Sequence, residues 1–153
     1  MMTRIWGFDP GLTVGVAVID CSNPSGVEIV HSTHYWYEVA VLWFGIVQEG
    51  VIESYPYEQH LVVENYVGRG PVSKEGRITT QLAGHFYHTG RVLAAQMLFT
   101  GVELANPDAR LSMYGLATKM IKEATGKEPQ RDQLSAMAHA LAYAERSGIN
   151  VQR

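Results

Sequence analysis

The chain has 153 residues, of which 46% are hydrophobic and 18% are charged, and its formal net charge is −3. This composition indicates one compact domain with an apolar core and excludes a disordered chain. The single cysteine, Cys21, excludes an internal disulfide and any zinc site built on several thiolates, which favours a reducing, cytoplasmic setting.

The start of the chain has no long apolar stretch, and the most apolar segment, Val39 to Val47, is too short to cross a bilayer. We therefore expect neither a secretory signal nor a membrane segment. The negative net charge weighs against a nucleic-acid binder, because such proteins usually carry a basic surplus. Basic residues nevertheless gather in two regions: Arg69, Lys74 and Arg77, and then Lys119, Lys122, Lys127 and Arg131.

Three segments in the first part of the chain are typical of β-strands. Arg4 to Phe8 is short and apolar, and it is ended by the turn Asp9-Pro10-Gly11. Thr13 to Asp20 is apolar on both faces, as in a central strand, and a turn leads from it to Val27 to Trp36. The short connections predict an antiparallel meander.

Helices and two further short strands follow, and their order predicts an α/β sheet with helices packed on it. The expected elements are a helix from Glu38 to Ser54, a strand from Leu61 to Val63, a helix from Ile78 to Phe99, a strand from Val102 to Ala105, and helices from Leu111 to Thr125 and from Arg131 to Ser147.

Two carboxylates occupy matching places at the ends of apolar strands, Asp9 before its turn and Glu64 after Val63. In an open α/β sheet, ligands gather beyond the carboxyl ends of the strands. If the first and fourth strands are parallel neighbours, the two acids emerge together and require a positive charge between them, which Mg²⁺ or Mn²⁺ supplies. Taken singly, Asp9 is better explained as an ordinary turn residue and Glu64 as a solvated strand end, but their matching places together favour a site.

The last predicted helix supplies further candidates. Asp132 and His139 lie seven positions apart, about two helical turns, so one or both can face the acids. Ser135 and Ala136 fall between them, and the surrounding alanines allow the helix to approach the sheet closely. The alternative is a core histidine and an Asp132 favoured at a helix start by the dipole.

Three stretches together resemble a known family: IWGFDPGLTVGVAVID near the start, LVVENY in the middle and DQLSAMAHALAYA near the end. The chain resembles RuvC-like Holliday junction resolvases, most closely the small ones of bacteriophages, over nearly its whole length. The resemblance implies a single ribonuclease H-like domain over residues 1–153, with a five-stranded mixed sheet of three antiparallel and two parallel strands flanked by helices.

The resemblance also implies the roles of the candidate residues. Asp9 would bridge the metals, and Glu64 would be a second ligand. The family's last helix carries two acids one turn apart, whereas this chain has Ala136 and His139 at those positions. His139 is therefore a candidate ligand or base, with Asp132 as its acidic alternative or companion.

The implied reaction is phosphodiester hydrolysis with two Mg²⁺ ions per active site, for which Mn²⁺ would substitute. One ion would activate a water molecule and the other would stabilise the leaving oxygen. The implied substrate is branched DNA: four-way junctions, with forks and flaps as further substrates. A homodimer is expected because a symmetric junction needs paired cuts, with the helix from Ile78 to Phe99 as part of its surface.

The glycine-rich segment after Glu64 is expected to be an exposed loop that meets DNA. Tyr66 would stack on an unpaired base, while Arg69, Lys74 and Arg77 would contact phosphates. A basic loop that is merely solvated explains these residues as well.

Three alternatives remain open. The first is a nuclease of the same fold that acts on RNA or on forks and flaps. The second is a non-catalytic module that binds branched nucleic acid, which the incomplete acidic pattern of the last helix allows. The third, a phosphotransferase, lacks any recognised phosphate-binding loop in this sequence.

Overall fold

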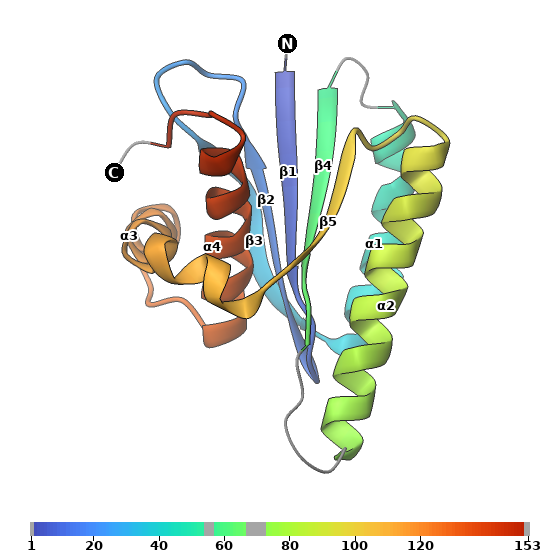
Figure 1. The fold of residues 1–153 in the computed structure, drawn as a ribbon. Coiled ribbons are helices and arrows are strands. Elements are labelled where there is room, and N and C mark those ends of the chain that lie inside the picture. The colour runs from blue at the N-terminus through green and yellow to red at the C-terminus, as the bar shows by residue number, and fades with distance from the viewer. Residues whose placement is uncertain (1, 54–56, 67–72, 152–153) are drawn as a thin grey trace.

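A five-stranded mixed sheet forms the centre of the molecule, in the order β3-β2-β1-β4-β5. The computed structural model in Figure 1 describes residues 2–53, 57–66 and 73–151. The first three strands pair antiparallel, whereas β4 pairs parallel with β1 and with β5. The strands are β1 (Met2–Asp9), β2 (Thr13–Asp20), β3 (Glu28–Trp36), β4 (Tyr57–Glu64) and β5 (Gly101–Ala105). The predicted five-stranded mixed sheet is confirmed.

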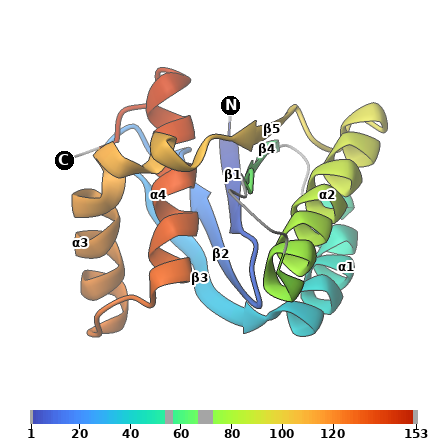
Figure 2. The same ribbon diagram turned by 60° about the horizontal axis from the view of Figure 1, so that its bottom comes forward.

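Helices cover both faces of this sheet, as Figures 1 and 2 show. On one face lie α1 (Tyr37–Glu53) and α2 (Lys74–Ala95), side by side. On the other lie α3 (Tyr114–Thr125) and α4 (Arg131–Arg146). Because both faces are covered, β1 and β2 read as continuous apolar runs without alternation.

The two faces have different cores. Under α1 and α2 the core is aromatic, and Phe8 of β1 stacks on Phe86 of α2 with ring centroids 4.6 Å apart. Under α3 and α4 the core is aliphatic and rich in alanine, because seven α4 residues from Ala136 to Ala142 are buried in succession. Small side chains bring α4 close to the sheet, which decides the geometry of the site described below.

Some predicted boundaries were wrong. The helix expected from Ile78 begins at Lys74, because the Ser73 side chain accepts a hydrogen bond from the Gly76 N–H and caps it. It ends at Ala95, and Met97 has a left-handed backbone with φ 61°. The strand expected over Leu61 to Val63 extends over Tyr57–Glu64 because it pairs along β1.

The helix expected from Leu111 is two elements. A 3₁₀ helix, η1 (Pro107–Met113), begins where the Asn106 side chain accepts from the Asp108 N–H, and α3 follows directly. Pro107 occupies the first position of this helix, where its fixed backbone angle and missing N–H suit a helix start. Within the described ranges, no helix combines the length and apolar character needed to cross a bilayer.

Candidate active site at the carboxyl ends of two strands

The acids Asp9 and Glu64 end two neighbouring parallel strands. Phe8 of β1 is in register with Val63 of β4, so the next residue of each strand emerges at the same edge of the sheet. The predicted convergence of these two acids is confirmed. In open α/β sheets this edge is where ligands bind.

Helix α4 approaches this edge through backbone contacts. A Cβ atom added to Gly15 of β2 would lie 1.8 Å from the Asp132 carbonyl oxygen, and one added to Gly7 of β1 would lie 2.4 Å from the Ala136 carbonyl oxygen. Real side chains do not fit in these gaps, so glycine is required at both positions. The first turns of α4 are therefore held directly over the last part of β1 and the start of β2.

Two α4 side chains, one turn apart, bind the Glu64 carboxylate. Ser135 Oγ donates to Glu64 Oε2 over 2.9 Å, and His139 Nε2 lies 2.8 Å from the same oxygen. Because a carboxylate only accepts, Nε2 carries the hydrogen. The His139 ring is buried, and no described group bonds to its Nδ1 atom. In this arrangement His139 orients Glu64 by donating to it.

Arg110 of η1 binds the other oxygen of Glu64. Its NH1 atom lies 2.9 Å from Glu64 Oε1 and also donates to the Pro107 carbonyl oxygen over 2.8 Å. Its Nε–H donates to the Tyr114 hydroxyl group. Three contacts hold the guanidinium in one orientation, so a fixed positive charge lies beside the acids.

Glu64 is held as an anion. Burial by itself would raise its pKa, but the hydrogen bond and charge of His139, the charge of Arg110 and the Ser135 hydroxyl together bring the pKa below its ordinary value. The Glu64 carboxylate therefore keeps its negative charge at neutral pH. This charge repels the neighbouring Asp9 carboxylate.

The pKa of Asp9 is shifted in the opposite direction, upward. Burial, then repulsion by Glu64 and by Asp132, raise the pKa of Asp9 to about 7, while a hydrogen bond with Ser135 and the charge of Arg110 oppose the rise. Burial also raises the pKa of Asp132, with Arg131 and His34 opposing the rise and Glu64 adding to it. We refer to Asp9, Glu64 and Asp132 as the carboxylate cluster.

The chemistry of this cluster fits a hard divalent cation in part. Carboxylate oxygens are the ligands that Mg²⁺ and Mn²⁺ prefer, and a cation would relieve the repulsion that raises the Asp9 pKa. Within the described residues, however, no three His, Cys, Asp or Glu side chains are arranged to hold a metal ion. Asp9 and Glu64 supply two carboxylates, and no third ligand is grouped with them among the described residues.

Two site residues were missed by sequence reasoning, Ser135 and Arg110. The signal for Ser135 was present, because it lies four positions before His139 and therefore on the same helix face. Arg110 had no such signal. It reaches Glu64 because β5 pairs with β4 up to Ala105, so the segment after β5 emerges beside Glu64.

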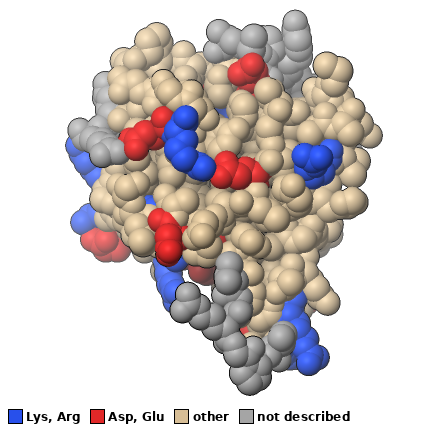
Figure 3. Space-filling model, viewed as in Figure 1, with Lys and Arg blue, Asp and Glu red and all other residues tan. Residues whose placement is uncertain are grey.

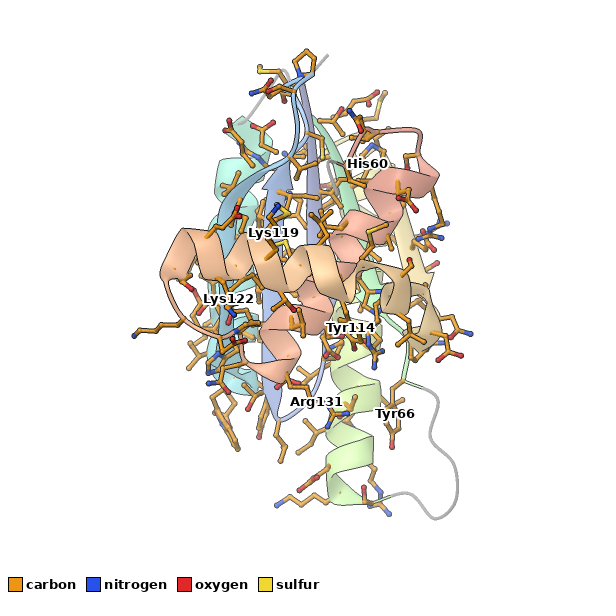
Figure 4. All side chains as sticks on the ribbon, turned by 90° about the vertical axis from the view of Figure 1, so that its left-hand side faces the viewer. His60, Tyr66, Tyr114, Lys119, Lys122 and Arg131 are labelled. Atoms are coloured by element: carbon orange, nitrogen blue, oxygen red, sulfur yellow. The ribbon has the colours of Figure 1, made fainter. Side chains whose placement is uncertain are left out.

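The residues predicted to meet DNA lie at the same end of the sheet. Tyr66 follows β4 and is exposed, and its hydroxyl group approaches Gly76 at the start of α2 (Figure 4). Lys74 and Arg77 are exposed in the first turn of α2. Arg69 falls outside the described residues.

The fold is shared with solved junction resolvases. A structure of Thermus thermophilus RuvC aligns with a TM-score of 0.59 at 17% identity, covering 95% of this chain and 97% of that one. The same protein in complex with a Holliday junction substrate aligns with a TM-score of 0.56 at 18% identity, covering 95% and 96%. The chain has the RuvC fold.

A solved structure from yeast has the same fold. The yeast mitochondrial Holliday junction resolvase aligns with a TM-score of 0.58 at 12% identity, covering 92% of this chain and 78% of that one. No protein-family model and no curated protein matches the sequence. At these identities the comparisons establish the RuvC fold alone.

Proposed function

We propose that this protein is a metal-dependent endonuclease that cleaves branched DNA, four-way junctions above all. The observation that carries the proposal is the pair of half-buried acids at adjacent strand ends, where repulsion by Glu64 contributes to an Asp9 pKa of about 7. Strongly shifted acids at the ligand-binding edge of a sheet are typical of functional sites. The RuvC fold directs this chemistry toward phosphodiesters.

Asp9 and Glu64 are the residues that would hold Mg²⁺ or Mn²⁺, and Asp132 is the candidate for the third ligand. We favour Asp132 over His139 because the His139 Nε2 atom that faces Glu64 carries a hydrogen, and its Nδ1 atom is buried. Two bound ions would supply an activated water molecule and charge stabilisation of the leaving oxygen.

The other site residues position Glu64 and keep it charged. His139 and Ser135 hold one of its oxygens, and Arg110 holds the other. Such supporting contacts restrict a ligand to one orientation, and their loss typically costs ten- to a hundredfold in metal affinity or activity, about the effect expected for each of these residues.

DNA would approach the end of the sheet where the cluster lies. Tyr66, Lys74 and Arg77 border this end, and Figure 4 places Arg131 near it as well. The face seen in Figure 3 carries only scattered charges of both signs, so we do not place the DNA there. A second basic group, Lys119 and Lys122 of α3, projects from another side, and Lys122 is paired with Glu128.

A homodimer is part of the proposal, since a symmetric junction needs two cuts. The predicted dimer surface was the helix that forms α2, but the outer face of α2 is largely polar. The neighbouring α1 exposes Val39, Leu42 and Ile46 at positions that share one helix face. We therefore propose that the dimer forms through α1, with α2 beside it (Figure 2).

Cleavage of defined substrates tests the proposal. Wild-type protein with Mg²⁺ or Mn²⁺ is expected to nick a four-way junction faster than a fork, a flap, a duplex or a matched RNA. Asp9→Asn should bind the same junction without cutting it. Cutting that continues in EDTA, or equal cutting by Asp9→Asn, would overturn the assignment.

A second candidate, a non-catalytic junction-binding module, is favoured by one observation. Arg110 and His139 already hold both oxygens of Glu64, and no three-ligand group is present among the described residues. Mn²⁺ titration followed by electron paramagnetic resonance separates the two. The enzyme binds Mn²⁺, and Asp9→Asn or Asp132→Asn weakens that binding. The module binds junctions but no Mn²⁺.

A further inference from the structure

A cavity of about 290 Å³ lies at the end of the sheet that carries the carboxylate cluster. It opens between the turn after β1, the end of β3 and the start of α2. The residues that line it are Leu12, Trp36, Tyr37, Lys74, Glu75 and Ile78.

Sheet topology puts this cavity at the same end of the molecule as Asp9 and Glu64. β3 runs in the direction of β1, because each pairs antiparallel with β2. Trp36 is the last residue of β3, and the Tyr37 N–H donates to the Leu12 carbonyl oxygen over 2.9 Å. With strands about 4.8 Å apart and Trp36 two residues beyond the level of Asp9, the ends of β3 and β1 are about 12 Å from each other.

The lining suits a flat aromatic ligand with a negative charge nearby. Trp36 is 53% exposed, although tryptophan is a residue that folding usually buries. Its ring centroid lies 5.2 Å from that of Tyr37, at an angle of 46°, so two π surfaces border the opening. Leu12 and Ile78 add apolar wall, Lys74 contributes a positive charge, and Glu75 offers a hydrogen-bond acceptor.

The cavity matches a single nucleobase. Its volume is at the lower end of the range of about 300–1,000 Å³ that small-molecule pockets span, which excludes a base pair. Aromatic side chains stack on any unpaired base, and lysine contacts phosphates. Bases inside a duplex are stacked on both sides, whereas a base at a branch point can lose one stacking neighbour and is then less costly to unstack.

We propose that this cavity binds one unstacked base of the branched substrate, with Trp36 stacked on the base and Lys74 on a neighbouring phosphate. Because the cavity and the carboxylate cluster lie at the same end of the sheet, this base would lie within a few nucleotides of the phosphate that is cleaved. The inference rests on the proposed function and makes Trp36 a determinant of branch selectivity.

Binding of junctions that carry 2-aminopurine tests this inference. The fluorescent base is placed at each of the three positions on either side of the cleavage site, and binding is measured in EDTA so that no strand is cut. Wild-type protein should change the fluorescence at one of these positions and not within an arm.

Trp36→Ala should abolish that change and weaken junction binding by about 5- to 100-fold while leaving duplex binding unaltered. Trp36→Phe should restore most of the affinity, because a smaller aromatic ring still stacks. Val30→Ala is the matched control, because Val30 is an exposed apolar residue on the same strand and does not line the cavity.

Two results are kept apart by this design. If wild-type protein binds and cuts junctions but Trp36→Ala and Val30→Ala behave alike, the base-binding cavity is wrong and the nuclease stands. If wild-type protein neither binds nor cuts branched DNA, the proposed function is wrong. The proposal that the cavity binds a base of that DNA is then wrong as well.

Discussion

At the scale of single residues, the raised pKa of the Asp9 carboxyl group makes the stability of the protein depend on pH. This pKa is about 7 in the folded protein and near 3.8 in an unfolded chain. Between these pH values the folded state binds more protons, so the contribution of Asp9 to the free energy of unfolding falls as pH rises from about 4 to about 7. Above that range the loss is complete and amounts to at most roughly 4 kcal/mol.

Asp9→Asn removes this charge and is expected to stabilise the metal-free protein at about pH 8 by roughly 2–4 kcal/mol, with a much smaller gain at about pH 5. Urea unfolding in EDTA at both pH values measures the difference. A gain that is the same at both would mean that Asp9 is not destabilised by burial and repulsion.

The ion pair between Arg110 and Glu64 gives a second residue-scale prediction. Both side chains are mostly covered, at 17% and 14% exposure, whereas the Arg146–Glu103 pair is 50% and 31% exposed. Removing a cation from a largely buried pair leaves a carboxylate without its partner, which costs more than loss of a surface pair.

Arg110→Gln should therefore lower the free energy of unfolding by about 1–3 kcal/mol, and Arg146→Gln by less than about 1 kcal/mol. Cleavage is expected to fall about tenfold or more in Arg110→Gln alone, because Glu64 loses one of its positioning contacts. Urea unfolding and initial cleavage rates measure the two effects. Equal losses in both variants would show that Arg110 is an ordinary surface residue.

At the scale of elements, the close packing of α4 on β1 and β2 determines the geometry of the site. Gly15→Ala puts a Cβ atom 1.8 Å from a carbonyl oxygen of α4, and a backbone atom cannot yield as a side chain does. The first turn of α4, which carries Asp132, has to lift from the sheet. We expect a loss of about 3 kcal/mol or more in stability, together with loss of cleavage.

Gly84→Ala is the control for this change. Gly84 lies exposed within α2 with no atom near the added methyl group, so alanine should stabilise the protein by up to about 1 kcal/mol through its higher helix propensity. Thermal unfolding compares the two variants. A Gly15→Ala protein as stable as wild type would contradict the close packing of α4 on β2.

Assembly through α1 is the prediction that belongs to the whole molecule. Leu42→Glu places a charge in the centre of the exposed apolar stripe and should convert a dimer to a monomer in sedimentation experiments. Val92→Glu does the same on α2, where Val92 is exposed among polar residues, and should leave the dimer intact. Dissociation by Val92→Glu alone would return the interface to α2.

The sequence by itself determined the order of the elements and the two acids at strand ends. Apolar runs that end in Asp9 and Glu64 are local patterns, and the fold class follows from their order along the chain. Helix boundaries were less accurate because they depend on caps such as Ser73 and Asn106, each a single side-chain hydrogen bond.

Only the tertiary structure decided which groups meet those acids. Arg110 comes from a separate segment that β5 pairing brings to Glu64, and the cavity at Trp36 joins three segments distant in sequence. The role of His139 as a donor to Glu64 depends on where α4 sits, which Gly7 and Gly15 set by backbone contact. Spacing along a chain fixes the faces of one helix or strand, whereas contacts between elements follow from packing that no local pattern encodes.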